Sequence, residues 1–254
     1  MRKFFLLAAL LFLTSLSSES YARSEYQTPS LVIDFEGGVL WQTVNDIQIP
    51  NSSEGTRFSL VDLAGKSPYP AGRVYITWNI NRTHGLKLLL APFSVTEEVI
   101  PEKDLKFEGE EFSGGEVLEA TYKFNSWRIS YRYRFRDGEK ASWYIGFTAK
   151  VRDARIELVQ NGNGSDKPDL GFVPLLHLGV DWRISRNWSL ISDLDALAGG
   201  PGRAIDFSAK FYYRINSDWS IGAGYRTLEG GADVEEVYNF AWLHYGIACI
   251  RYRY

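Results

Sequence analysis

One histidine and three aspartates are the residues of this chain whose types and spacing could carry out a reaction. His177 is followed by Asp193, Asp195 and Asp206, all in stretches where polar and apolar residues alternate. A carboxylate that orients a histidine ring allows the histidine to act as a general base toward water or a hydroxyl group. We therefore predict a candidate hydrolytic site in which Asp195 orients His177. No metal-binding signature accompanies these residues, and no metal is expected.

Strand pairing must bring these side chains together, because they are far apart in the sequence. If the turn at Arg186 centres two antiparallel strands, His177 faces Asp195 across the pair. If the loop near Gly200 centres the next pair, Asp206 lies beside Asp195. Because side chains alternate between the two faces of a strand, these registers place the whole group on one face of a sheet.

The elements that carry these residues show a period of two. Between 127 and 135, aromatic and aliphatic residues alternate with Arg128, Arg132 and Arg134. Arginines that face lipid near the middle of a bilayer cost about 2–4 kcal/mol each, so these side chains must point into the lumen of a barrel. The stretches 172–184, 203–215 and 238–254 repeat the pattern.

The alternation predicts an all-β transmembrane barrel with antiparallel up-and-down strands. Five strand ends carry an aromatic residue, a polar residue and a further apolar or aromatic residue, as in Trp182-Arg183-Ile184, and four of these are followed by a tight polar turn. Eight strands are the alternative to ten. The ten expected strands lie near 30–42, 72–81, 86–96, 119–135, 141–158, 172–184, 188–197, 203–215, 219–228 and 238–254. The fifth loses its alternation around 152–155, which predicts a β-bulge there.

A narrow barrel must fill its lumen with side chains, and charges inside it must be paired. The register predicts that Arg152 or Arg155 approaches the aspartates, and that Lys150 pairs with Asp181. The alternative to a catalytic site is therefore a structural plug. Its predicted charge network comprises Arg128, Arg132, Lys150, Arg152, Asp181, Lys210 and Arg226. Further inward-facing charges expected to pair with them are Asp34, Glu36, Glu157, Asp193, Asp206 and Arg251.

The N-terminal residues 1–22 have the pattern of a signal peptide, and residues 23–254 are expected to form the barrel. Arg2 and Lys3 precede a short apolar run, and Ser20-Tyr21-Ala22 offers small residues at the cleavage positions. The rest of the chain has no apolar run long enough for a helical span. The formal net charge of −3 gives no reason to expect nucleic acid as a partner. No cofactor motif is present, and none is expected.

Two long connections are expected at one end of the barrel, at 43–71 and 97–118. The second is rich in glutamate and aspartate. Surface loops carry binding functions more often than the strands that hold them. The sequence therefore predicts that an extracellular ligand, if there is one, binds at these loops.

The chain resembles the small outer-membrane β-barrel proteins of Gram-negative bacteria. Its last residues, Tyr252-Arg253-Tyr254, are similar to the terminal aromatic assembly signal of such barrels, although Cys249 stands where that signal often has glycine. The segments 224–233 and 238–245 resemble stretches of uncharacterised outer-membrane proteins. This resemblance implies the outer membrane as location, with lipid, lipopolysaccharide and the barrel assembly machinery as partners.

The sequence leaves several functions open. A barrel with a charge-paired, mostly filled lumen would serve a structural or surface-interaction role. A hydrolase would use the cluster around His177, and a narrow pore lined by arginines would favour small anions. A soluble exported barrel that binds an apolar ligand would need the charged face outward, which the aromatic strand ends disfavour.

Overall fold

A computed structural model of the chain describes residues 29–64, 68–200 and 202–254. The predicted signal peptide lies outside these ranges. Nearly all of the described residues lie in strands and their turns, with one short helix, α2 (Leu60–Ala64). No helix in the described ranges is long and apolar enough to cross a membrane.

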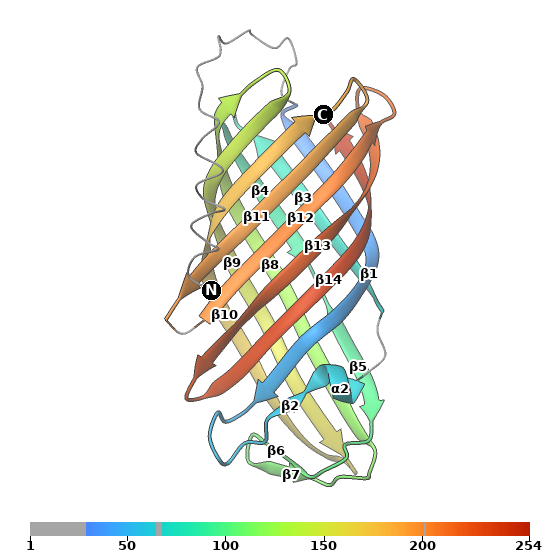
Figure 1. Cartoon of the computed structure of the whole chain (residues 1–254), viewed down its shortest axis with the longest axis vertical. Helices are drawn as coiled ribbons and strands as arrows, with labels where there is room; N and C mark the ends of the chain where they lie inside the picture. Colours follow the sequence, from blue (N-terminus) through green and yellow to red (C-terminus); the bar gives the residue numbers. More distant parts are fainter. Residues whose placement is uncertain (1–28, 65–67, 201) are drawn as a thin grey trace.

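Ten strands form a closed antiparallel barrel (Figure 1). Each pairs with its neighbour along the chain, and pairing of the last with the first closes the sheet. The prediction of an up-and-down barrel with ten strands rather than eight is confirmed. The ten strands are β1 (Leu31–Gln48), β3 (Tyr69–Asn79), β4 (His84–Ala91), β8 (Leu118–Asp137), β9 (Ala141–Gln160), β10 (Asn163–Arg183), β11 (Trp188–Gly199), β12 (Gly202–Arg214), β13 (Trp219–Val234) and β14 (Val237–Arg253).

Short strands complete the sheet at the end of the barrel that carries the long connections, here called the outer end. Pro92, which has no N–H to donate, lies between β4 and β5 (Ser94–Val99), and both of these strands pair with β8. A two-residue strand, β2 (Phe58–Ser59), pairs with the end of β1. A separate hairpin is formed by β6 (Leu105–Phe107) and β7 (Glu110–Phe112).

The outer surface of the barrel is apolar, as the alternation predicts. On β8, Ile129 and Tyr131 are exposed, whereas Arg128 and Arg132 are buried. The same division holds on β12, where Phe211 faces outward and Lys210 faces the lumen. Because the exposed side chains form a belt around the strands, this surface suits contact with hydrocarbon.

The predicted β-bulge at 152–155 is wrong, because this part of β9 pairs without interruption with both β8 and β10. The register shifts instead between Gln42 and Val44 on β1, and between Arg134 and Arg136 on β8. The polar run in β9 lies toward the outer end of the barrel, where outward-facing side chains need not be apolar.

The turn between β9 and β10 also differs from the prediction. It consists of Asn161 and Gly162 alone, both with positive φ (53° and 81°), and the strands run on to it from either side. Asn-Gly is the pair that a two-residue hairpin turn favours, since both positions need left-handed backbone. Placing the turn here opposes Lys150 to Val173 and Asp181 to Ser142, so the predicted pairing of Lys150 with Asp181 is wrong.

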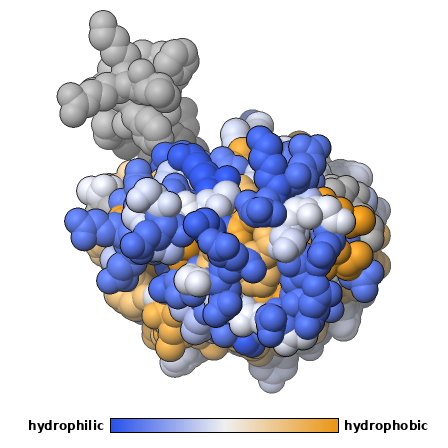
Figure 2. Space-filling model, turned by 90° about the horizontal axis from the view of Figure 1, so that it is seen from below, coloured by the Kyte–Doolittle hydropathy of each residue, from blue (hydrophilic) through white to orange (hydrophobic). Residues whose placement is uncertain are grey.

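The connections beyond the outer strand ends form a cap over part of the lumen. Phe107 of β6 is fully buried and packs edge-on against Phe58 at 6.3 Å. These rings belong to one apolar cluster with Leu118 and Leu158 at the barrel's end. Figure 2 views this end and shows mostly hydrophilic residues, with apolar residues exposed between them near the centre.

The C-terminal residue takes part in closing the barrel. Tyr254 donates its N–H to the carbonyl oxygen of Leu31 at 2.9 Å and accepts the N–H of Leu31 at 3.2 Å. Tyr252 packs against Trp219 with ring centroids 4.8 Å apart. The two residues predicted as an assembly signal therefore lie at the seam between the first and last strands.

We expect deletion of Tyr254 to lower the yield of assembled barrel, because it removes both seam hydrogen bonds and the terminal aromatic ring. The fraction of protein that migrates faster without heating in a gel measures assembly. Tyr254→Phe keeps the backbone and the ring, and should assemble like the parent. Equal assembly of the deletion variant would show that the terminal residue is dispensable.

Candidate functional site: a charge network in the lumen

His177 and its predicted aspartates meet inside the barrel. The pairing of β10 with β11 opposes His177 to Asp195 and Gly179 to Asp193, and the next pair opposes Asp195 to Asp206. The His177 Nδ1 atom lies 2.7 Å from Asp195 Oδ1, and Nε2 lies 3.7 Å from Asp193 Oδ1. The registers predicted from the two turns are confirmed.

An arginine from the far wall completes this group. Asp195 and Asp206 face each other on neighbouring strands, where like charges repel. Arg128 reaches from β8 and donates from Nη1 to Asp195 at 2.9 Å and from Nη2 to Asp206 at 2.6 Å. Since β9 and β10 separate β8 from β11 in the sheet, this contact crosses the lumen.

The predicted approach of Arg152 or Arg155 to the aspartates is wrong. Arg152 lies opposite Gly171 and pairs with Asp169, and Arg155 pairs with Asp166 at 2.9 Å. Both arginines lie toward the outer end of β9. The tight turn that follows β9 sets a different register between β9 and β10 from the predicted one.

The network continues around the lumen through residues of β12, β13 and β1. Arg226 donates to Asp206 at 2.6 Å and lies 3.4 Å from Glu36. Lys210 donates to Glu36 at 2.6 Å, and both side chains are about 1% exposed. Tyr75 accepts a hydrogen bond from Arg226. Charges buried this deeply are stable only when each has a partner.

Two further ion pairs extend the network toward the end with the short turns. Lys87 of β4 donates to Asp193 at 2.8 Å. Arg251 donates to Asp34 at 2.6 Å and 3.0 Å, and the Tyr212 hydroxyl donates to the same carboxylate at 3.0 Å. Asp34 and Glu36 were predicted to face the lumen among charges that pair with one another. Lys87, whose partner lies 106 residues further along the chain, was not predicted to take part.

The remaining predicted members of the network take different positions. Arg132 lies over the Tyr144 ring, 4.0 Å from its centroid. Asp181 accepts a hydrogen bond from the Tyr144 hydroxyl at 3.2 Å. Lys150 is 4% exposed, yet among the described residues it has no hydrogen bond or ion pair. Its ammonium lies 5.0 Å from the centroid of Phe124.

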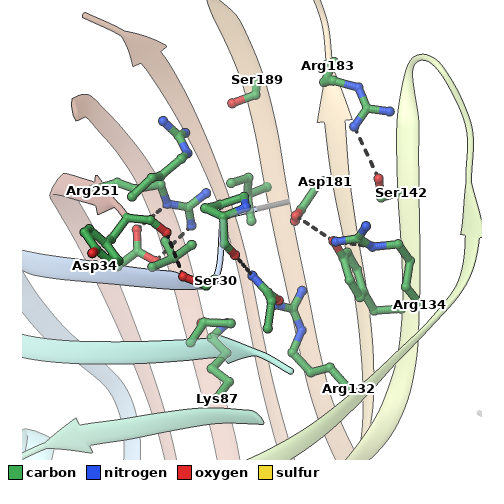
Figure 3. Close-up of a pocket in the computed structure, with 18 of the residues that line it drawn as sticks. Ser30, Asp34, Lys87, Arg132, Arg134, Ser142, Asp181, Arg183, Ser189 and Arg251 are labelled. Atoms are coloured by element: carbon green, nitrogen blue, oxygen red, sulfur yellow. Dashed lines mark hydrogen bonds and ion pairs between the residues drawn. The ribbon is translucent and has the colours of Figure 1, made fainter. Parts of the chain in front are cut away.

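The network separates two cavities. The one toward the short turns measures about 620 Å³ and has polar walls, with Asp34 and Arg251 on one side and Arg134 and Asp181 on the other (Figure 3). The cavity toward the outer end measures about 340 Å³ and is lined largely by apolar residues. Between them, beside His177, there is room of only about 20 Å³.

This space limits the chemistry at His177. The ring is 1% exposed, and its Nε2 atom has no hydrogen-bond partner. A cavity of about 20 Å³ holds a water molecule but no larger substrate. The group therefore lies in the closed interior of the lumen and not at an open rim. Within the described ranges, no cluster of three or more histidine, cysteine or acidic side chains could hold a metal ion.

Comparisons with known proteins show the class of fold. No protein-family model and no curated protein matches the chain. The outer membrane protease OmpT from Escherichia coli has a similar structure, with a TM-score of 0.50 and 10% identity over 91% of this chain and 99% of that one. The attachment invasion locus protein Ail of Yersinia pestis has a TM-score of 0.41 and 9% identity, over 87% and 99%.

The fold is that of the outer-membrane β-barrels of Gram-negative bacteria. At this level of identity, the similarity to the protease extends to the fold and not to the reaction.

We expect Lys210→Met to destabilise the barrel strongly, by about 3–5 kcal/mol, because it leaves the Glu36 carboxylate buried without its shortest contact. Combining it with Glu36→Gln should restore most of the stability, since no unpaired charge remains. Urea unfolding followed by tryptophan fluorescence measures the free energy of unfolding of the single and the double variant. A double variant as unstable as the single one would mean that the ion pair itself, and not the orphaned charge, sets the cost.

Proposed function

We propose that the protein is an integral outer-membrane barrel with a permanently closed lumen and a structural or surface-interaction role. The observation that carries this proposal is the connected charge network, which runs from Lys210 through Arg226 and Arg128 to His177 and Lys87. It occupies the lumen between the two cavities and leaves only about 20 Å³ beside His177.

Opening such a network is energetically expensive. Removing one partner of a buried ion pair costs about 3–5 kcal/mol, because the other charge stays in a low-dielectric interior. A path for solutes would have to separate several pairs together, including Lys210 with Glu36 and Arg226 with Asp206. The cost favours a plug over the alternative of a pore for small anions.

The surface role is supported by the cap at the outer end. Its loops are held by the apolar cluster around Phe107, so their polar side chains are displayed on an ordered base. Glu111 is exposed and contacts Lys106 at 2.8 Å. We propose the loops 43–71 and 97–118 as the binding surface for an extracellular ligand. Lipid, lipopolysaccharide and the barrel assembly machinery complete the proposed partners.

A hydrolase at His177 is the second candidate. The contact of Nδ1 with Asp195 and the free Nε2 atom match the arrangement of an oriented general base. The arrangement lacks a route for the substrate, since His177 and Asp193 adjoin a cavity the size of one water molecule. The contact with Asp195 is equally consistent with a histidine that completes the plug.

We expect planar-bilayer recordings of the protein to show no discrete conductance steps. Replacing Glu36, Asp206, Lys210 and Arg226 together by alanine should create them, because it empties the plug without leaving unpaired charges among the four. The control is Arg152→Ala with Asp169→Ala, an ion pair outside the plug, which should stay silent. Discrete conductance steps recorded with the parent protein would refute a closed lumen.

The hydrolase alternative predicts that His177→Gln abolishes cleavage of esters or peptides while the barrel still assembles. Under the closed-barrel proposal we expect no cleavage by the parent protein. The matched control is His84→Gln, which changes a histidine near the short turns. Activity that is lost in His177→Gln and kept in His84→Gln, with normal heat-dependent gel mobility, would establish the enzyme.

A further inference from the structure

The wall of the barrel is incomplete beside the outer cavity. The pairing of β10 with β11 ends at Leu176 and Ala196, and β11 and β12 turn back near Gly199 and Gly202. β10 continues to Asn163 and pairs over that length with β9 alone. Figure 1 shows the ends of β11 and β12 far short of the outer ends of β9 and β10.

A proline accounts for the end of this pairing. Arg183 donates its N–H to Lys140 before β9, and Ile184 donates to Trp188 of β11. Because neighbouring residues of a strand direct their hydrogen-bonding groups to opposite sides, the even-numbered residues of β10 face β11. Pro174 is the next of these after Leu176 and has no N–H to donate. Pro168 has the same orientation further along the free edge.

The cavity behind this gap is lined from both sides of it. Val173 and Leu175 come from β10, and Leu197 and Ala204 from the hairpin across the gap. Leu228 and Leu243 add to the apolar wall. On the outside of β10, Leu170 and Phe172 are 77% and 68% exposed, so the approach to the gap is apolar as well.

One positive charge faces this cavity without a partner. Among the other cations that line it, Arg128 pairs with Asp206, Arg203 with Glu229 at 2.5 Å, and Arg152 with Asp169. Lys150 makes no hydrogen bond or ion pair with a described side chain, and its ammonium lies 5.0 Å from the centroid of the Phe124 ring. A buried ammonium is costly when unpaired, so an anion beside it would be strongly favoured.

We propose that this cavity binds a single acyl chain with an acidic head group, which enters sideways through the gap between β10 and the β11–β12 hairpin. The carboxylate or other acidic head lies beside Lys150, and the chain packs against Leu175, Leu197 and Leu228. A volume of about 340 Å³ is at the small end for ligand sites, which suits one chain and not a whole lipid with several. This site goes beyond the closed-lumen proposal and does not depend on it.

The test uses the purified protein in phosphatidylcholine vesicles with a photoreactive hexadecanoate, and hexadecanol with the same reactive group as reference. Labelled peptides are identified by mass spectrometry. We expect labels from the acid on the lumenal side of β10 and β12, at about ten-fold the level of the alcohol, as a charge-assisted contact would give. Equal labelling by acid and alcohol, confined to outward-facing residues, would overturn the proposal.

Matched variants separate the charge from the cavity. Lys150→Met should reduce labelling by the acid to that of the alcohol. Arg155→Met, which removes a paired cation of the same strand outside the cavity lining, should not. Ala204→Trp fills the cavity and should abolish the lumenal label; Ala209→Trp places the same ring on the lipid face of β12 and should not. No change in Lys150→Met would refute the acidic head group. Heat-dependent gel mobility verifies that each variant is folded.

A second arm identifies the source of the chain. Phosphatidylglycerol with the photoreactive group in one chain replaces the free acid. Lumenal labelling by this lipid as well as by the acid supports entry of one chain of a membrane lipid, and labelling by the free acid alone supports a free fatty acid. Both results support the site, and absence of lumenal labelling in both arms overturns it.

Discussion

Arg128 bridges two carboxylates that would otherwise repel each other, and the interior of the barrel depends on this contact. Asp195 and Asp206 are direct neighbours on β11 and β12, and the guanidinium from the far wall lies within 2.9 Å of both. A planar group with donors along two edges can hold two acceptors at fixed positions. Because the contact spans the lumen, it also ties opposite walls of the sheet together.

The remaining polar groups of the lumen follow from the same constraint. Lipid around the barrel forces charged side chains inward, and the low-dielectric interior then requires that each be paired. Glu36, Lys210 and Arg226 meet this requirement. Lys150 does not, and it faces the cavity that opens toward the gap in the wall. A connected set of ion pairs in the middle of the lumen, with an unpaired lysine facing the outer cavity, is consistent with a plug below a binding site.

The local features of the chain were predictable because they depend on near neighbours. Alternation identified ten strands and the inward face of β8, and the turn at Arg186 set His177 opposite Asp195. The turn at Asn161 and Gly162 carried an equally strong signal, but the polar segments on either side of it, 152–155 and 163–169, show no strand alternation. Because this turn was not predicted, the expected register of β9 with β10 was wrong, and so were the expected positions of Lys150 and Arg152.

By itself, the sequence determined the ten strands, the inward face of β8 and the pairing of β10 with β11 and of β11 with β12, since these depend on a period of two and on turn chemistry. Tertiary structure alone decided which charges meet across the lumen, where the cap lies and where the wall is open. Arg128 and Asp206 are 78 residues apart, and their contact depends on the closure and stagger of the whole sheet. No local pattern carries that information, because closure is a property of all ten strands together.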